Sequence, residues 1–207
     1  MDRSEIRRES LRVASALGVF ALPTLPLLEG TLKPRPTDEV ASRILAMISV
    51  AGAACGFDRT KALAWLEQEW ASSGLGRRER AFLLHGSGNP VQFVAAIEGL
   101  WTLAWSMGIT PVLDFSRECD DSLIEQLPDL RKAESTSGFR ARMVPLPCET
   151  IVAALDLAFC LHWAVRDAML AGKPSPGRVK PQVVVERRRA LEWLLGRAEW
   201  DEVSLDT

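Results

Sequence analysis

Several residue types that mark specialised proteins are scarce in this 207-residue chain. It has no tyrosine and only two histidines, and aromatic residues make up 7% of the sequence. Its 25 basic residues nearly balance 27 acidic ones, giving a formal net charge of −2. This balance argues against a nucleic-acid partner, because nucleic-acid-binding proteins usually present a basic surface. No apolar run approaches the ~20 uninterrupted residues of a membrane span, so we expect no membrane partner either. What is present is the composition of an ordinary soluble globular protein.

The four cysteines are isolated from one another along the chain. Cys55, Cys119, Cys148 and Cys160 form no C-x-x-C pair, although a zinc site needs ligands at such short spacings. We therefore expect no metal and no cofactor. Cysteines within apolar runs, such as Cys55 and Cys160, are typical of small core residues in a reducing compartment.

The N-terminal residues 1–36 are expected to form one helix, capped by Ser4, and then a proline-containing extended segment packed on the core. This region faintly resembles a signal peptide. However, acids interrupt its basic part, and Pro23 and Pro26 break its apolar part, so we expect a cytoplasmic protein. Residues 37–207 are expected to form a single all-helical domain.

Helical periodicity, capping residues and glycine stops predict an all-α fold with about seven or eight helices. After the first helix, the predicted segments are 37–55, with Thr37 as N-cap, 58–73, 77–85, 90–107, 121–127, 148–170 and 182–197. The helix over 90–107 is apolar nearly all round, which places it at the centre. We expect a single-domain irregular bundle around this helix and the last two. The tryptophans in helical patterns, Trp70 among them, are interpreted as core or interface residues.

Charged residues on the helical wheels give the one indication of a site. Arg187 lies in the middle of the apolar face of the last helix, and His162 and Arg166 lie on the apolar face of the helix before it. Buried cations need carboxylates or carbonyls as partners, because an unpaired buried charge costs several kcal/mol. Glu98 and Glu186 are the best-placed acids.

Two interpretations of these groups remain open. In the first, they form a structural network, and the protein is a non-enzymatic module that binds an unknown protein partner or assembles with itself. In the second, Glu98, His162, Arg166 and Arg187 line a cleft for a small polar or anionic ligand, in an enzyme or a sensor. His162 would then act as general base, oriented by Glu98. We favour the first interpretation, because buried ion pairs are commonly structural.

Five sequence blocks carry a family resemblance. They are Glu39–Arg43, Glu98–Gly108, Leu155–Arg166, Val185–Leu194 and Trp200–Thr207. Together they resemble the uncharacterised bacterial family called domain of unknown function 4272, over roughly residues 35–207. The family has no established activity, so the resemblance implies membership and no reaction.

The blocks contain the residues that a bound ligand would contact under the second interpretation. These are Arg166, Arg187, Glu186, Asp156, Trp105, Trp200 and Asp201. On the helical wheel Asp156 falls on a narrow acidic stripe, for which a solvated helix edge is the simplest expectation. If the C-terminal segment folds back, Asp201 can pair with Arg187 or Arg166.

Overall fold

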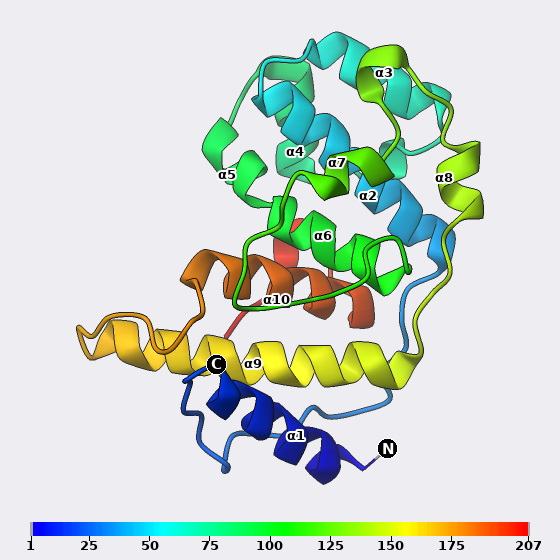
Figure 1. Ribbon diagram of the computed structural model, residues 1–207. Helices are drawn as coiled ribbons and strands as arrows, with labels where there is room; N and C mark the ends of the chain where they lie inside the picture. The colour runs from blue at the N-terminus through cyan, green and yellow to red at the C-terminus, as the bar shows by residue number, and fades with distance from the viewer. Residues whose placement is uncertain (1, 207) are drawn as a thin grey trace.

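Three helices that the sequence predicted to be central form the middle of the molecule. They are α6 (Ile97–Ser106), α9 (Cys148–Leu170) and α10 (Pro181–Leu195). Figure 1 shows α10 between the other two, and it packs against both. The computed structural model describes residues 2–206, and within that range it contains ten α-helices and no strand. The all-α prediction is confirmed.

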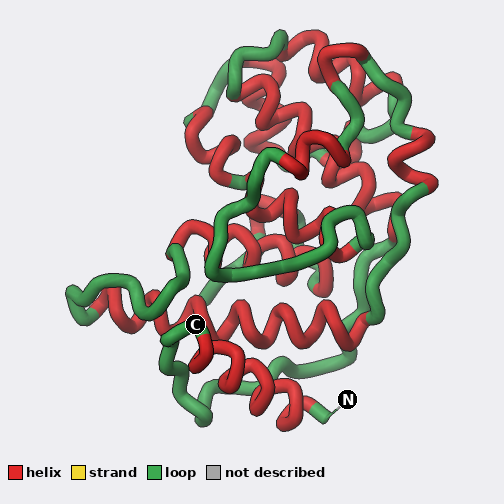
Figure 2. The backbone as a smooth tube through the Cα atoms, in the orientation of Figure 1, coloured by secondary structure: helices red, strands yellow, loops and turns green. Residues whose placement is uncertain are grey.

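The remaining elements complete an irregular bundle, in which loops separate many short helices (Figure 2). They are α1 (Arg3–Ala16), α2 (Thr37–Ala54), α3 (Arg59–Gln68), η1 (Ser72–Gly74), α4 (Arg77–His85), α5 (Pro90–Ala95), α7 (Ser122–Gln126), η2 (Leu130–Lys132), α8 (Ser137–Ala141) and η3 (Trp200–Glu202), where η denotes a 3-10 helix. Helix α2 packs against α3, α5, α6 and η1 and so joins this part of the bundle to the central helices.

The helix predicted over 90–107 is broken into α5 and α6, with Ala96 as the shared end. Every residue from Glu98 to Ser106 is buried, whereas all six residues of α5 are at least partly exposed. Only the second half is therefore central. This break and the short α8 raise the number of helices from the expected seven or eight to ten.

Side-chain capping explains where several helices begin. The Asp58 carboxylate accepts a hydrogen bond from the Lys61 amide at 2.9 Å, as its predicted capping role requires. Two other predicted caps are wrong. Asp2 caps α1 by accepting a hydrogen bond from the Ser4 amide, and Thr37 is already the first residue of α2.

Cys55, expected in the core, is exposed, and Trp70, interpreted as a core or interface residue, lies outside the core. Helix α3 ends at Gln68, and Trp70 takes up a left-handed conformation (φ 55°) that directs its side chain into solvent, where it is 90% exposed. Cys55 is also exposed because it follows the last residue of α2, whereas Cys160 is buried as predicted.

The N-terminal residues wrap the face of α9 opposite α10 (Figure 1). Helix α1 packs along α9, and the extended segment then runs back beside it. Ala21 and Leu25 pack against Cys160, and the Leu32 carbonyl lies 3.5 Å from the Cys148 thiol. Helix α9 is thus covered on two sides. Among the described residues it is the one helix long and apolar enough to cross a membrane, and 56% of its most apolar window is buried inside the protein. The buried core helix of a globular protein can have the same length and hydropathy.

The close approach of η1 to α2 generates a prediction about Gly74. A Cβ atom at this position would overlap the Ser42 carbonyl of α2, and backbone atoms cannot yield as a flexible side chain can. We expect Gly74→Ala to lower the free energy of unfolding by at least about 2 kcal/mol in a denaturant titration. Gly138→Ala is the control, because a Cβ at this position meets open space. This substitution also replaces a glycine in a helix by a better helix former. Equal denaturation midpoints would contradict the packing of η1 on α2.

Candidate functional site

An ion pair between α6 and α10 forms the centre of the candidate site. Arg187 donates to Oε2 of Glu98 from Nε at 2.9 Å and from Nη2 at 2.6 Å. Both side chains are buried, and Arg187 is only 2% exposed. The sequence predicted the burial of Arg187 and named Glu98 among its best-placed partners, and the structure brings the two together.

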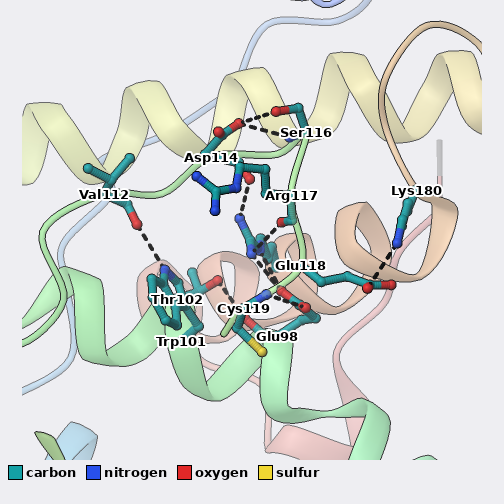
Figure 3. A network of polar contacts seen from close by, with 11 residues as sticks. Glu98, Trp101, Thr102, Val112, Asp114, Ser116, Arg117, Glu118, Cys119 and Lys180 are labelled. Carbon is teal, nitrogen blue, oxygen red and sulfur yellow. Dashed lines mark hydrogen bonds and ion pairs between the residues drawn. The ribbon is translucent and has the colours of Figure 1, made fainter. Parts of the chain in front are cut away.

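The same two side chains also hold the loop between α6 and α7 (Figure 3). Arg187 donates to the carbonyl of Asp114 at 2.7 Å and to that of Arg117 at 3.0 Å. The second carboxylate oxygen of Glu98 accepts a hydrogen bond from the Cys119 amide at 2.8 Å. All three guanidinium nitrogens of Arg187 and both oxygens of Glu98 are thus used within the protein. Four of the five N–H donors of Arg187 are engaged by partners within the protein, so the buried pair has little hydrogen-bonding capacity left for an anionic ligand.

Cys119 is the thiol closest to this pair in sequence and in space. Burial, followed by the negative charge of Glu98, raises the pKa of its thiol to about 12. A thiol with so high a pKa is a poor nucleophile, because the thiolate is the reactive form. Burial and the charge of Glu98 therefore keep the Cys119 thiol protonated and unreactive.

His162 lies in a separate network, with Arg188 and the C-terminal segment. Arg188 Nη1 lies 2.6 Å from Nδ1 of His162, and the guanidinium also donates to the carbonyls of Leu205 at 3.2 Å and Asp206 at 3.1 Å. A guanidinium has only donors, so Nδ1 of the imidazole accepts and the ring is neutral. Burial, then Arg188 and Arg166, lower the pKa of His162 to about 4. The predicted burial of His162 is confirmed, and Arg188 is buried beside it.

Two further buried ion pairs hold other parts of the chain. Arg7 donates to Asp156 at 3.0 and 2.8 Å and to the carbonyls of Leu25 and Pro26 in the N-terminal segment. The placement of Asp156 on a solvated edge is therefore wrong: its side chain is buried, and its partner comes from the far end of the sequence. Arg43 donates to Glu79 at 2.5 and 2.7 Å and to a carbonyl of η1 at 2.8 Å.

The other predicted site residues lie apart from the Glu98–Arg187 pair or are exposed. Arg166 is exposed, which corrects its predicted burial, and Glu186 is half-buried with Arg189 at 3.5 Å. Trp105 is buried in α6. The C-terminal segment folds back, but Asp201 accepts a hydrogen bond from the Arg78 amide at the start of α4 and pairs with neither Arg187 nor Arg166.

Trp200 directly precedes Asp201 in the sequence. Its side chain is buried between an arginine and a second tryptophan. The Arg43 guanidinium lies 3.9 Å from its ring centroid, and the Trp193 ring contacts it edge-on at 5.9 Å. Trp200 therefore packs as part of the core and has no free face for a ligand.

Two hollows lie in the described part of the chain, and neither is lined by Glu98, His162 or Arg187. One is a narrow, mainly apolar space between α2, α5 and α6, too small to hold a water molecule. The other is an open hollow of about 550 Å³ beside α3, α4 and α5. Within residues 2–206, no group of three or more His, Cys, Asp and Glu is placed to hold a metal ion. The cleft of the second interpretation, with its four polar residues side by side, is not formed.

These features define an all-α protein whose buried charges are neutralised inside the fold. The chain belongs to the family described as domain of unknown function (DUF4272), whose sequence profile matches residues 7–203. The family resemblance found in the sequence is thereby confirmed and extended towards the N-terminus. No curated protein and no solved structure matches the chain significantly.

Removal of Arg187 should expose the dependence of the fold on its ion pair. Arg187→Ala leaves Glu98 buried without its cation, so we expect a loss of about 3–5 kcal/mol in the free energy of unfolding. Arg189→Ala removes only a half-buried cation that lies 3.5 Å from Glu186, and should cost less than about 1 kcal/mol. Thermal and denaturant unfolding measure both effects. Equal melting temperatures would contradict the central place of the Glu98–Arg187 pair.

The lowered pKa of His162 predicts a specific loss of stability in acid. The unfolded imidazole, with a pKa of about 6.5, binds a proton that the folded one rejects until the pH approaches about 4. Folding stability should therefore fall as the pH drops from about 6.5 to about 4, by up to about 3 kcal/mol from this residue. His162→Gln retains an acceptor for Arg188 but cannot titrate. If the stabilities of wild type and variant run parallel across this pH window, His162 is not buried in its neutral form.

Proposed function

We propose that this protein is a non-enzymatic module that binds another protein chain through an apolar face around α5. The observation that carries the proposal is the contrast between two classes of side chain. The buried charged groups that a substrate site would use are saturated by partners within the fold. Large apolar side chains, in contrast, remain in solvent on neighbouring elements.

The face consists of three exposed apolar residues, Leu84, Val91 and Val94, with half-buried Phe57 and Phe93 beside them; we call it the α5 face. Val91 is 72% exposed and Leu84 is 50% exposed. Val91 and Val94 are three residues apart in one helix, so their side chains lie on the same side of α5. Contiguous exposed apolar surface of this kind is typical of protein-interaction sites.

The buried arginines support the same proposal from the other direction. A cleft that holds an anionic substrate needs a guanidinium with free donors, and Arg187 uses its donors on Glu98 and on two loop carbonyls. A general base needs a pKa near the working pH, whereas the pKa of His162 is lowered to about 4. The groups that suggested chemistry are those that position helices and loops.

Quantitative co-purification from the native host tests the proposal. Three tagged baits are compared: wild type, Val91→Glu on the α5 face, and Val144→Glu as the control. Val144 is 67% exposed, close to Val91, but its backbone is tied to Met107 at the opposite end of α6. We expect at least one protein, which can be the untagged chain itself, to be retained by wild type and Val144→Glu and reduced about tenfold or more by Val91→Glu, because a buried charge weakens binding by over 1.4 kcal/mol. Identical retained proteins for all three baits would overturn the proposal.

A further inference from the structure

We infer that the contact between His162 and Arg188 is a pH-sensitive switch, which releases the C-terminal residues 203–206 when the imidazole takes up a proton. We call these four residues the tail. The inference goes beyond the proposed protein-binding function and does not depend on it. It is carried by the attachment of the tail to Arg188, by one nitrogen of that side chain and by the charges around His162.

The tail is held to the rest of the chain mainly through one arginine. Arg188 donates from Nη1 to the Leu205 carbonyl at 3.2 Å and from Nη2 to the Asp206 carbonyl at 3.1 Å. Among the described residues, the tail's other hydrogen bonds lie within the tail itself. Val203 adds apolar packing against the core. Loss of the two arginine bonds would therefore leave the tail attached by apolar packing.

The residues just before the tail are anchored without this contact. Trp200 is buried in the core, and Asp201 accepts a hydrogen bond from the Arg78 amide at 3.0 Å. Neither contact uses Arg188 or His162. Release of the tail therefore begins after η3 and leaves the helix bundle in place.

The nitrogen that holds Leu205 is also the nitrogen that contacts the imidazole. Arg188 Nη1 lies 2.6 Å from Nδ1 of His162, which accepts the hydrogen bond in the neutral ring. A protonated imidazole has donors on both nitrogens, so Nδ1 and Nη1 would become two cationic donors facing each other in a buried site. Movement of the guanidinium away from the ring relieves this repulsion, but it also breaks the bonds to Leu205 and Asp206. Proton uptake and tail release are thereby coupled.

The groups around His162 oppose its protonation while the tail is docked. Burial, then the positive charges of Arg188 and Arg166, lower the pKa of the ring to about 4. Helix α1 packs on the same helix as the ring, but its Arg7 is paired with Asp156 at 2.8 Å, so this pair supplies no net negative charge to the ring.

Two acids act on Arg188 and form no hydrogen bond to the ring. Glu192 accepts from Nε of Arg188 at 3.2 Å, and the Asp206 carboxylate accepts from the Ser204 hydroxyl at 2.7 Å. Departure of the tail and the guanidinium relieves both burial and repulsion, so the ring binds its proton more tightly once the tail is released. The midpoint of release is therefore expected between the docked value of about 4 and the ordinary histidine value of about 6.5.

An NMR titration of the full chain from pH 7 to pH 4 tests the inference. The ring signals of His162 report its protonation, and exposed His85, the second histidine, is the reference. The backbone 15N heteronuclear NOE of the tail reports its mobility. We expect this NOE to fall at the pH where His162 takes up its proton, while the amides of α6 stay rigid. A tail that stays rigid after His162 is protonated, or that becomes mobile only when α6 unfolds, overturns the inference.

Two variants separate the trigger from the attachment. His162→Gln cannot titrate, so the tail NOE should show no step between pH 6.5 and pH 4. Arg188→Leu removes the shared nitrogen, and its tail should be mobile at both pH 7 and pH 4. A step of wild-type size in His162→Gln overturns His162 as the trigger. A rigid tail in Arg188→Leu overturns Arg188 as the attachment.

The coupling must also act in reverse, because linkage between two equilibria is reciprocal. Val203→Ser weakens the packing of the tail, so we expect the proton-binding constant of His162 to rise about fivefold or more, at the lower end of typical couplings. Val144→Ser is the control, since Val144 is 67% exposed and lies outside the tail. An unchanged His162 midpoint in Val203→Ser would show that the tail and the imidazole are independent.

Discussion

The Glu98–Arg187 ion pair is the contact on which the arrangement of α6, α10 and the loop after α6 depends. Transfer of two charges from water to the interior costs several kcal/mol for each, so the pair adds little net stability over an apolar contact of similar volume. Its value is geometric. The planar guanidinium of Arg187 makes four hydrogen bonds, and these fix the positions of the Glu98 carboxylate and of two loop carbonyls relative to α10. Any other packing of α6 on α10 would leave a buried charge without partners.

The same solution recurs wherever an irregular segment must be held against the bundle. Arg7 holds the N-terminal segment, Arg43 holds the turn at η1, and Arg188 holds the C-terminal residues, in each case through backbone carbonyls. Arg7 and Arg43 also bond both oxygens of a buried acid from another element, and Arg187 donates twice to one oxygen of Glu98. Several of the ten α-helices within residues 2–206 have only five or six residues, and packing between such short helices fixes their connecting loops poorly. Buried arginines supply the missing constraints, because each bonds to a helix and a loop at once.

Helical periodicity was sufficient to place the central helices and to find Arg187 and Glu98. The position of each residue on the wheel of its own helix was enough to predict that its side chain faces the core. It failed where the outcome depends on contacts distant in sequence. Asp156 is buried because α1, 149 residues away, supplies Arg7. Arg166 has the direction of a core residue, but it lies in the last turns of α9, which extend beyond the rest of the bundle in Figure 1. Arg188 is buried beside Arg187 because α10 is enclosed by neighbours on more than one side.

The contrast between buried charges with partners inside the fold and exposed apolar side chains is the basis of the proposed protein-binding function. A protein that evolved around a polar cleft keeps donors free and titratable groups near neutrality, whereas here Arg187 and His162 are committed to structure. Exposed apolar side chains, in contrast, have no partner within the fold. Burial of apolar surface is favourable and non-directional, so it needs only a partner surface of matching shape. Part of this surface lies around α5, a helix in which no residue is fully buried. Under the proposed protein-binding function, the buried charged groups hold the bundle together, and exposed apolar side chains such as Val91 and Val94 contact the partner.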